Sequence, residues 1–170
     1  MWEPSTGRLI RTLQGHTAEV LAVSYSQNGA LLASAGFDRT IRLWNSRSGA
    51  LVRTLNGHTG TVTSIAFGPE ANTIASGSED GSIRIWSTQD GALLLTLMAF
   101  DDDEWIAYNP QGNYSGSARA GKCIAWSIGA TVYDFDQFFE KFYTPDLLLR
   151  VFQGKFMASA EPPDNSRKNM

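Results

Sequence analysis

Apolar and polar positions alternate in short stretches along the first hundred residues. Strict alternation places Ile83 and Ile85 on one face of the stretch at 82–87. Comparable stretches lie at 62–67, 73–78 and 92–97. Polar turn signals separate them, among them "GPEAN" and the Asp80-Gly81 pair. Alternation over a few residues is typical of β-strands, and Asp-Gly is a hairpin-turn dipeptide. The pattern therefore predicts four antiparallel strands between residues 57 and 98.

The same pattern occurs earlier in the chain. "GHTAEVLAVSYS" at 15–26 returns as "GHTGTVTSIAFG" at 57–68, and "LLASAGFDRTIRLWN" at 31–45 returns as "TIASGSEDGSIRIWS" at 73–87. Alignment of 7–48 with 49–90 needs no gap and contains 15 identical residues in 42 positions. A fixed period of this length predicts a duplicated structural unit.

Four short strands per unit, with Gly-His near the start and Trp near the end, have the period of a propeller blade. Residues 1–100 resemble WD repeats, with Trp44-Asn45 and Trp86-Ser87 in place of Trp-Asp. The resemblance implies an all-β fold of WD-repeat β-propeller blades. We expect an outer strand of a preceding blade at 1–14 and two full blades at 15–56 and 57–98.

A third unit at 99–133 is degenerate. It keeps Trp126 but has lost the Gly-His and the turn aspartate. Propellers have four to eight blades, so the predicted ring is incomplete. Either the chain is the C-terminal piece of a longer protein or copies associate, for example as a dimer. We expect one open face around Val20, Val23 and Tyr25, and another around Ile106, Tyr108 and Ile124 unless the tail covers it.

The remaining residues predict a short α-helical tail at 134–157 and a disordered terminus at 158–170. Phe135, Phe138, Phe139, Phe142 and Tyr143 share one helical face. A second helix is expected to begin at Thr144-Pro145-Asp146, to present Leu147, Leu148, Val151 and Phe152, and to end at Gly154. The aromatic face either packs on the blades or docks a partner. The segment from Glu104 onward also resembles the C-terminal end of bacterial multi-domain WD-repeat proteins, some with caspase-like or nucleotide-binding domains.

His16, Ser34 and Asp38 are the three ingredients of a hydrolase triad. In WD repeats, however, these positions and a tryptophan form a buried hydrogen-bonded chain. The resemblance therefore implies two structural tetrads: His16, Ser34, Asp38 and Trp44, and His58, Ser76, Asp80 and Trp86. A triad needs an exposed nucleophile and an oxyanion hole. The same set twice, 42 residues apart, favours a structural role, and no catalytic residue is predicted.

Composition narrows the functional classes. The net charge of −3 gives no support to binding of nucleic acid or anionic membranes. No apolar run is long enough for a membrane span, and the lone Cys123 excludes an intramolecular disulfide, so a cytoplasmic location is predicted. The acidic run at 101–104 lacks calcium-loop spacing, and 116–122 is not a phosphate loop. No metal or cofactor is expected.

These observations predict a non-catalytic protein–protein interaction scaffold. The alternative is a regulatory or sensor segment of a multi-domain enzyme whose catalytic domain is not in this chain. In the family, three rim positions of each blade often contact partners. Carried over, the candidates are Glu19, Leu21 and Phe37, and Thr61, Thr63 and Glu79. Phe37 is the most specific, because an aromatic residue stands where a turn residue is normally polar.

Overall fold

The computed structural model describes residues 1, 3, 5–101, 103–120, 125–128, 131–134 and 142–153 of the 170-residue chain. The chain divides into two compact units, Met1–Met98 and Ala99–Met170. The first unit contains two four-stranded antiparallel blades. The second contains two short strand pairs and one short helix. The fold is therefore mainly β, as predicted.

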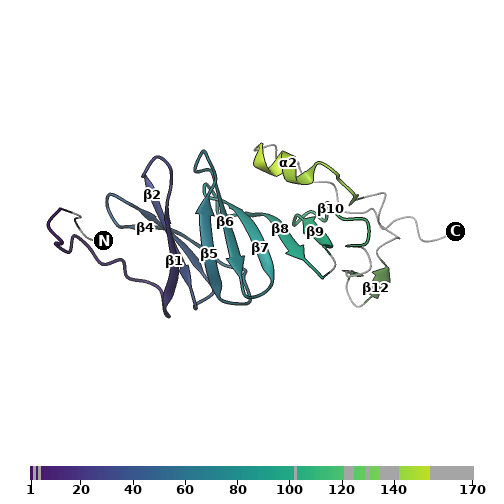
Figure 1. The fold of residues 1–170 in the computed structure, drawn as a ribbon, viewed down its shortest axis with the longest axis horizontal. Coiled ribbons are helices and arrows are strands. Elements are labelled where there is room, and N and C mark those ends of the chain that lie inside the picture. The colour runs from purple at the N-terminus through teal and green to yellow at the C-terminus, as the bar shows by residue number, and fades with distance from the viewer. Residues whose placement is uncertain are drawn as a thin grey trace. The chain divides into compact units, whose positions relative to one another are not determined.

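The first blade is a sheet in which the strands lie side by side in chain order (Figure 1). Its strands are β1 (Val20–Tyr25), β2 (Leu31–Gly36), β3 (Ile41–Asn45) and β4 (Leu51–Leu55). The second blade repeats this order with β5 (Val62–Phe67), β6 (Thr73–Ser78), β7 (Ser82–Ser87) and β8 (Leu93–Ala99). The first three strands of the second blade coincide with the predicted ranges, whereas the fourth begins one residue later and ends two residues later.

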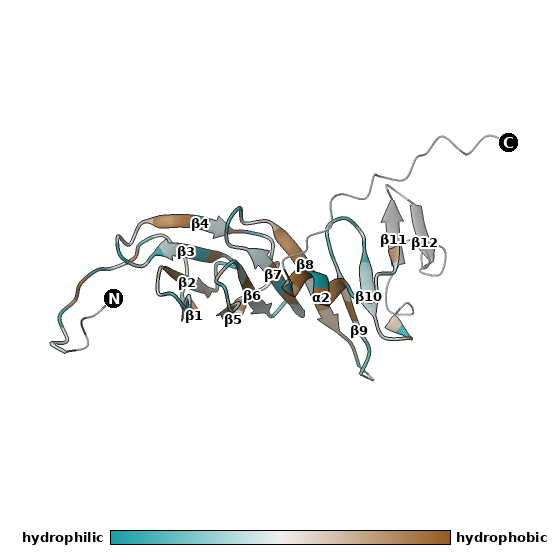
Figure 2. Cartoon of the chain, turned by 90° about the horizontal axis from the view of Figure 1, so that it is seen from above, coloured by the Kyte–Doolittle hydropathy of each residue, from teal (hydrophilic) through white to brown (hydrophobic). Residues whose placement is uncertain are grey.

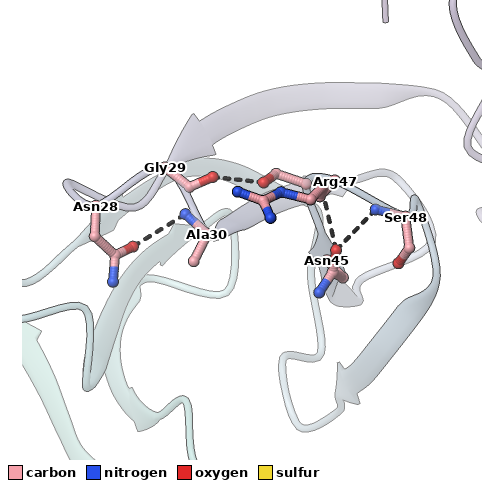
Figure 3. Close-up of a pocket in the computed structure, with 7 residues that line it drawn as sticks. Asn28, Gly29, Ala30, Asn45, Arg47 and Ser48 are labelled. Carbon is pink, nitrogen blue, oxygen red and sulfur yellow. Dashed lines mark hydrogen bonds between the residues drawn. The ribbon is translucent and has the colours of Figure 1, made fainter.

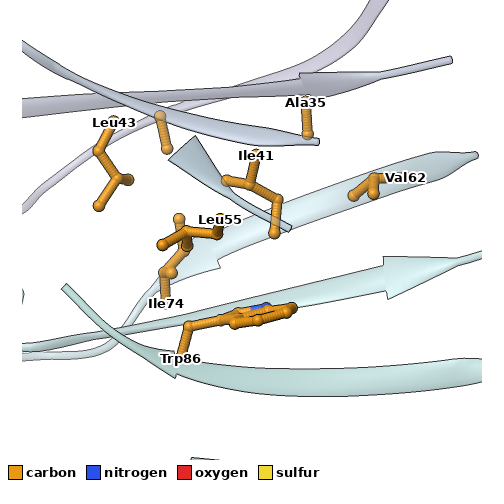
Figure 4. Close-up of a cluster of buried hydrophobic side chains, with 8 residues drawn as sticks. Ala35, Ile41, Leu43, Leu55, Val62, Ile74 and Trp86 are labelled. Atoms are coloured by element: carbon orange, nitrogen blue, oxygen red, sulfur yellow. The ribbon is translucent and has the colours of Figure 1, made fainter. Parts of the chain in front are cut away.

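The core of the first unit lies between the two blades, where β1 and β2 pack against β5 (Figure 4). The first blade contributes the apolar side chains Ala33, Ala35, Ile41, Leu43 and Leu55. The second blade contributes Val62, Ile74 and Trp86. In the first blade, Ala33 and Ala35 alternate along β2, and Ile41 and Leu43 alternate along β3. Ile83 and Ile85, which the sequence pattern places on one face, do not belong to this cluster, because Ile85 is buried elsewhere and Ile83 is 51% exposed.

The opposite face of the first blade is uncovered. Val23 is 67% exposed and Tyr25 is 53% exposed, and Val20 beside them is also exposed. Their counterparts one repeat later are covered: Val62 is fully buried, and Ile65 and Phe67 are half-buried against the core. The two faces differ because the first blade covers the second, while no described part of the chain covers the first.

The described residues of 1–14 contain no β-strand, so the predicted outer strand has no support in them. Among the described residues of this segment, only Leu9 lies in a β-bridge. The chain instead turns back on itself, since the backbone N–H groups of Ile10 and Arg11 donate to the carbonyl of Met1. An outer strand needs a third strand beside it, and none is present at this position among the described residues.

The second unit is built around β9 (Trp105–Tyr108) and β10 (Tyr114–Gly116), which form an antiparallel hairpin. The helix α2 (Leu147–Phe152) packs on both strands and buries Leu147 and Val151. Ile106 is buried, so the open face expected at this residue is closed, while Ile124 lies outside the described residues. A separate strand pair comprises β11 (Ala125–Ile128) and β12 (Thr131–Asp134). No helix in the described part of the chain is long and apolar enough to cross a membrane.

The start of the tail helix differs from the prediction. Thr144 does not cap α2: it lies two residues before the N-cap position, and its hydroxyl donates to the carbonyl of Phe142. Its backbone N–H donates to the carbonyl of Tyr114. Asp146 occupies the N-cap position without a side-chain capping bond, and its carboxylate pairs with Arg150 at 2.8 Å. Phe152, expected in the apolar stripe, is exposed. Of the predicted aromatic helical face, Phe135, Phe138 and Phe139 lie outside the described residues, as do the stop at Gly154 and the disordered terminus at 158–170.

Candidate functional site

Each blade contains a chain of hydrogen bonds that runs through four side chains. In the second blade, His58 Nδ1 lies 2.8 Å from Asp80 Oδ2, and His58 Nε2 lies 2.8 Å from Ser76 Oγ. The indole Nε1–H of Trp86 donates to the same serine oxygen at 2.8 Å. The first blade has the same arrangement at 2.7, 2.7 and 2.8 Å, formed by His16, Ser34, Asp38 and Trp44.

The order of donors in this chain follows from the groups at its ends. The indole N–H of Trp86 can only donate, and the carboxylate of Asp80 can only accept. Ser76 Oγ accepts from the indole and donates to His58 Nε2, and His58 Nδ1–H donates to Asp80. Every polar group is then satisfied when the imidazole is neutral. The arrangement is therefore a closed structural unit in which a buried histidine carries no charge.

Burial of the serines separates these tetrads from a hydrolase triad. Ser34 is 5% exposed and Ser76 is 1% exposed, and each hydroxyl already accepts an indole N–H. A nucleophilic serine must reach a substrate carbonyl beside an oxyanion hole. A serine enclosed in this way has no path to a substrate, so the geometry favours a structural role.

The aspartate of each tetrad holds a loop and a turn together. Asp80 Oδ2 also accepts the backbone N–H of Thr59 at 3.0 Å. Its Oδ1 accepts the backbone N–H and the hydroxyl of Ser82 at 3.0 and 2.6 Å. Asp38 makes the equivalent bonds to Thr17 and Thr40. The loop before the first strand of each blade is thus fixed to the turn between its second and third strands.

The glycine before each histidine is required by close approach to the tryptophan. Gly57 has φ of +153°, and a Cβ placed there would lie 3.0 Å from the ring of Trp86 and 2.8 Å from an Nη atom of Arg84. Gly15 has φ of +157° and an equally crowded position. A side chain at either position would collide with the tryptophan of the tetrad and with the neighbouring arginine. This explains why the sequence signal is a Gly-His pair.

The tetrad shifts the pKa of its two titratable groups. Burial alone would raise the pKa of Asp80, but hydrogen bonds from Ser82, His58 and Thr59 outweigh it and hold the pKa far below the ordinary value. Burial lowers the pKa of His58, despite the opposing effect of the Asp80 carboxylate. The pKa of Asp38 is likewise lowered, because bonds from Thr40, His16 and Thr17 outweigh its burial. Charged aspartates and a neutral His58 are therefore the states that fit the folded protein.

These shifts predict that the chain loses stability in acid. A group whose pKa is lower in the folded state stabilises the fold above its unfolded pKa, and this contribution falls as protons bind to the unfolded chain. Loss should begin below about pH 6.5 through His58 and continue below about pH 4 through the aspartates. Thermal unfolding from pH 8 to pH 3 measures it. Asp80→Asn should show a smaller fall between pH 5 and pH 3, and a midpoint that rises on acidification would contradict the assignment.

Next to the first tetrad lies the predicted rim of the first blade. The backbone N–H of Phe37 donates to the carbonyl of Glu19 at 2.9 Å, which brings these two residues together. Leu21 lies at a β-bulge, because the pairing of β1 with β2 shifts between Val20 and Ala22. A bulge re-aims a side chain. Leu21 and Phe37 are 46% and 48% exposed, so two apolar side chains are presented at one end of the blade.

The rim of the second blade is built in the same way, but one of its three predicted residues is buried. The backbone N–H of Glu79 donates to the carbonyl of Thr61 at 2.9 Å, and the pairing of β5 with β6 shifts at Thr63. Thr63 and Glu79 are exposed. Thr61 is buried, because it immediately precedes Val62 in the core between the blades. The sequence alignment could not show this, since the covering side chains come from the other repeat.

A second feature of the first blade was not predicted. A cavity of about 630 Å³ lies between the β1–β2 and β3–β4 turns, lined by residues 28–30 and 45–48 (Figure 3). These turns lie at the opposite end of the strands from Glu19 and Phe37. The described residues contain no group of three or more His, Cys, Asp or Glu side chains placed to hold a metal ion.

Comparison with known proteins agrees with this geometry. The family model "WD domain, G-beta repeat" (WD40) matches residues 7–45 and 49–87. The Periodic tryptophan protein 2 homolog of Schizosaccharomyces pombe is 44% identical over 43 residues, which are 25% of this chain and 5% of the relative. The Nuclear distribution protein PAC1 of Arthroderma otae is 51% identical over 43 residues, which are 25% of this chain and 9% of the relative. The match thus spans less than a tenth of the length of these curated relatives.

The matched ranges and the blades are offset by one strand. The range 7–45 includes the first tetrad and β1 to β3, and the range 49–87 includes the second tetrad and β5 to β7. The second range also supplies β4, the outer strand of the first blade. One repeat therefore completes the sheet of the repeat before it. Residues 7–45 and 49–87 are thus each similar to a WD40 repeat.

Proposed function

We propose that this chain is a non-catalytic protein-interaction scaffold that binds a protein partner at its contact rim, defined as Glu19, Leu21, Phe37, Thr63 and Glu79. The observation that supports this most directly is the exposure of Leu21 and Phe37 at the end of a blade whose turn is fixed by Asp38. Rigid exposed aromatic side chains are typical anchors of protein interfaces. WD-repeat proteins generally act in this way.

The chemistry of the rim favours a partner with an apolar anchor and basic neighbours. Leu21 and Phe37 offer apolar area, while Glu19 on the same blade and Glu79 on the second blade are exposed carboxylates. Complementary charges at the edge of an interface steer association and select partners, and the apolar centre provides most of the affinity. The net charge of −3 is also consistent with a basic partner and does not favour binding of nucleic acid.

We also propose that the uncovered face of β1 is a binding surface on which another blade packs. Val20, Val23 and Tyr25 are exposed there, whereas the same positions of the second blade pack against a neighbouring blade. We infer that a second copy of the chain covers this face. The alternative is that further blades of a longer protein cover this face.

The remaining predictions stay proposals. A cytoplasmic location is supported by the lone cysteine, which forms no intramolecular disulfide. The likeness of the C-terminal segment to bacterial proteins stays a prediction, and the relatives described above are fungal. Neither the matched family nor the names of those relatives refer to a caspase-like or nucleotide-binding domain, so the alternative of an enzyme's regulatory segment has no support.

The contact rim is tested by replacing its aromatic anchor. In affinity capture with quantitative mass spectrometry, Phe37→Ala is expected to reduce retention of a specific partner at least tenfold, since truncation of an interface anchor costs about 2 kcal/mol or more. Val52→Ala is the matched control, because Val52 is also exposed but lies on β4. If the Phe37→Ala variant retains every partner to the same extent as the unaltered chain does, the rim is not the binding site.

A further inference from the structure

The cavity between the β1–β2 and β3–β4 turns of the first blade is lined by hydrogen-bond donors whose positions are fixed by the turns. Pairing of Leu31 with Asn45 places the two turns side by side. The backbone N–H of Ser46 donates to the carbonyl of Ala30 at 3.0 Å, and its hydroxyl donates to the carbonyl of Gly29 at 2.5 Å. These bonds join segments that are far apart in sequence, so the cavity between them has a fixed shape.

Two asparagine side chains are oriented by the turns themselves. The Oδ1 atom of Asn28 accepts from the hydroxyl of Ser26 and from the backbone N–H of Ala30, at 2.9 and 3.0 Å. The Oδ1 atom of Asn45 accepts from the backbone N–H groups of Arg47 and Ser48, at 3.1 and 2.8 Å. Because each carbonyl faces its own turn, each NH₂ group faces away from it. Neither NH₂ group has a hydrogen-bond partner within the part of the chain that the structure describes.

Arg47 supplies the only charge among the lining residues. Its guanidinium group is drawn between the side chains of Asn28 and Asn45 (Figure 3). The backbone of Arg47 is held on both sides, since its N–H donates to Asn45 and its carbonyl accepts from Arg11 Nη1 at 3.0 Å. The guanidinium itself makes no ion pair or hydrogen bond with any described residue, and no carboxylate lines the cavity. One cation and two neutral donors therefore remain available.

The second blade shows that this donor set is not needed to form the turns. At the positions 42 residues later, Asn28 is replaced by Glu70, Arg47 by Gln89, and Ser48 by Asp90. The turn architecture is nevertheless retained, because Thr88 still donates from its backbone to the carbonyl of Asn72 and from its hydroxyl to that of Ala71. The pair of turns at this end of the blade is thus basic in the first blade and acidic in the second. The basic character of the first blade is a separate property that its fold does not require.

We propose that this cavity binds a carboxylate group of an acidic protein segment, with Arg47 as the charged anchor and the amides of Asn28 and Asn45 as flanking donors. The planar guanidinium matches a carboxylate in a two-bond geometry. One positive charge with neutral donors balances one negative charge, whereas a phosphate dianion would be left partly uncompensated. The inference rests on the proposed scaffold function and adds a second contact site, at the opposite end of the first blade from the contact rim.

The test is an NMR titration of the full chain with the probe peptide acetyl-Glu-Glu-Glu-Glu-amide at physiological salt. We expect saturable amide shifts at residues 28–30 and 45–48, and at least tenfold weaker binding by Arg47→Gln, which introduces the residue found at the equivalent position of the second blade. Arg39→Gln is the matched control, because Arg39 is exposed in the β2–β3 turn at the other end of the same blade. It should bind the peptide as the unaltered chain does.

Parallel titrations separate the possible outcomes. Inorganic phosphate is expected to cause weaker shifts at the same residues, and tighter binding of phosphate than of the peptide would overturn the carboxylate assignment. Equal affinity of Arg47→Gln and the unaltered chain, or shifts confined to other residues, would overturn the site. Phe37→Ala is expected to bind the peptide normally, so failure at this cavity and failure at the contact rim are distinguishable.

Discussion

Replacement of Trp86 by alanine is expected to destabilise the chain by about 3–5 kcal/mol, the range for removal of a buried tryptophan. Trp86 is almost fully buried and belongs to the cluster between the blades (Figure 4). Its indole N–H also donates to Ser76 in the tetrad. The substitution thus opens a cavity at the contact between blades and removes one donor from the hydrogen-bonded chain. Denaturant unfolding followed by circular dichroism measures the change.

Two variants separate these effects. Trp86→Phe keeps one aromatic ring in the cluster but loses the N–H and part of the buried ring system. A loss of at least about 1 kcal/mol, the contribution of the hydrogen bond, is therefore expected, and it should stay below the loss for Trp86→Ala. Trp44→Ala removes the equivalent side chain of the first blade, which donates to Ser34 but does not belong to the cluster between the blades. Its cost should be smaller than that of Trp86→Ala. If Trp86→Phe is as costly as Trp86→Ala, the hydrogen bond dominates and the packing argument is wrong.

The features that could be predicted from the sequence are those that one repeat determines by itself. Alternation, turn dipeptides and the spacing of His58, Ser76, Asp80 and Trp86 all lie within one 42-residue unit. Duplication then doubles the signal, because chance does not place the same polar set twice at one spacing. The strands β5 to β7 follow from such local information. The hydrogen-bonded chain of each blade was implied by the resemblance to WD repeats, and its four residues also lie within one such unit.

The features that were missed depend on contacts between segments that are distant in the sequence. Thr61 is buried because the first blade covers its neighbour Val62, and an alignment that treats the two repeats as equivalent cannot show this. Thr144 is held by the carbonyl of Tyr114, thirty residues earlier, and not by the first turn of α2. Local helix signals were present in that segment, but they do not include this bond between distant residues.

The cavity beside Arg47 was missed for a related reason. Its two turns are separated by the whole of β2 and β3, and only the strand register brings them together. A signal was nevertheless present in the sequence. Comparison of the repeats shows that Arg47 and Ser48 become Gln89 and Asp90, a change of charge within otherwise similar turns. Differences between repeats can mark binding residues, while identities mark the residues that the fold needs.

The uncovered face of β1 leads to the last prediction, that the purified chain self-associates at micromolar concentrations. Exposed contiguous apolar surface is uncommon on soluble monomers. Val23 and Tyr25 are more than half exposed, although the equivalent Ile65 and Phe67 are partly covered by a neighbouring blade. A surface shaped for another blade is therefore free, and a second copy supplies such a blade. Light scattering after size exclusion should give a mass of at least two chains.

The double variant Val23→Lys/Tyr25→Lys should shift the population to the monomer, because burial of two ammonium groups in an apolar contact is unfavourable. Val52→Lys is the control, because Val52 is exposed and belongs to β4, which lies away from β1 in the strand order. Part of β4 is hydrophobic (Figure 2), but replacement of Val52 should leave the association unchanged. An unaltered chain that is monomeric and unfolds cooperatively at these concentrations would contradict self-association. A monomer that associates only when a further WD-repeat segment is added would instead assign the face of β1 to blades outside this chain.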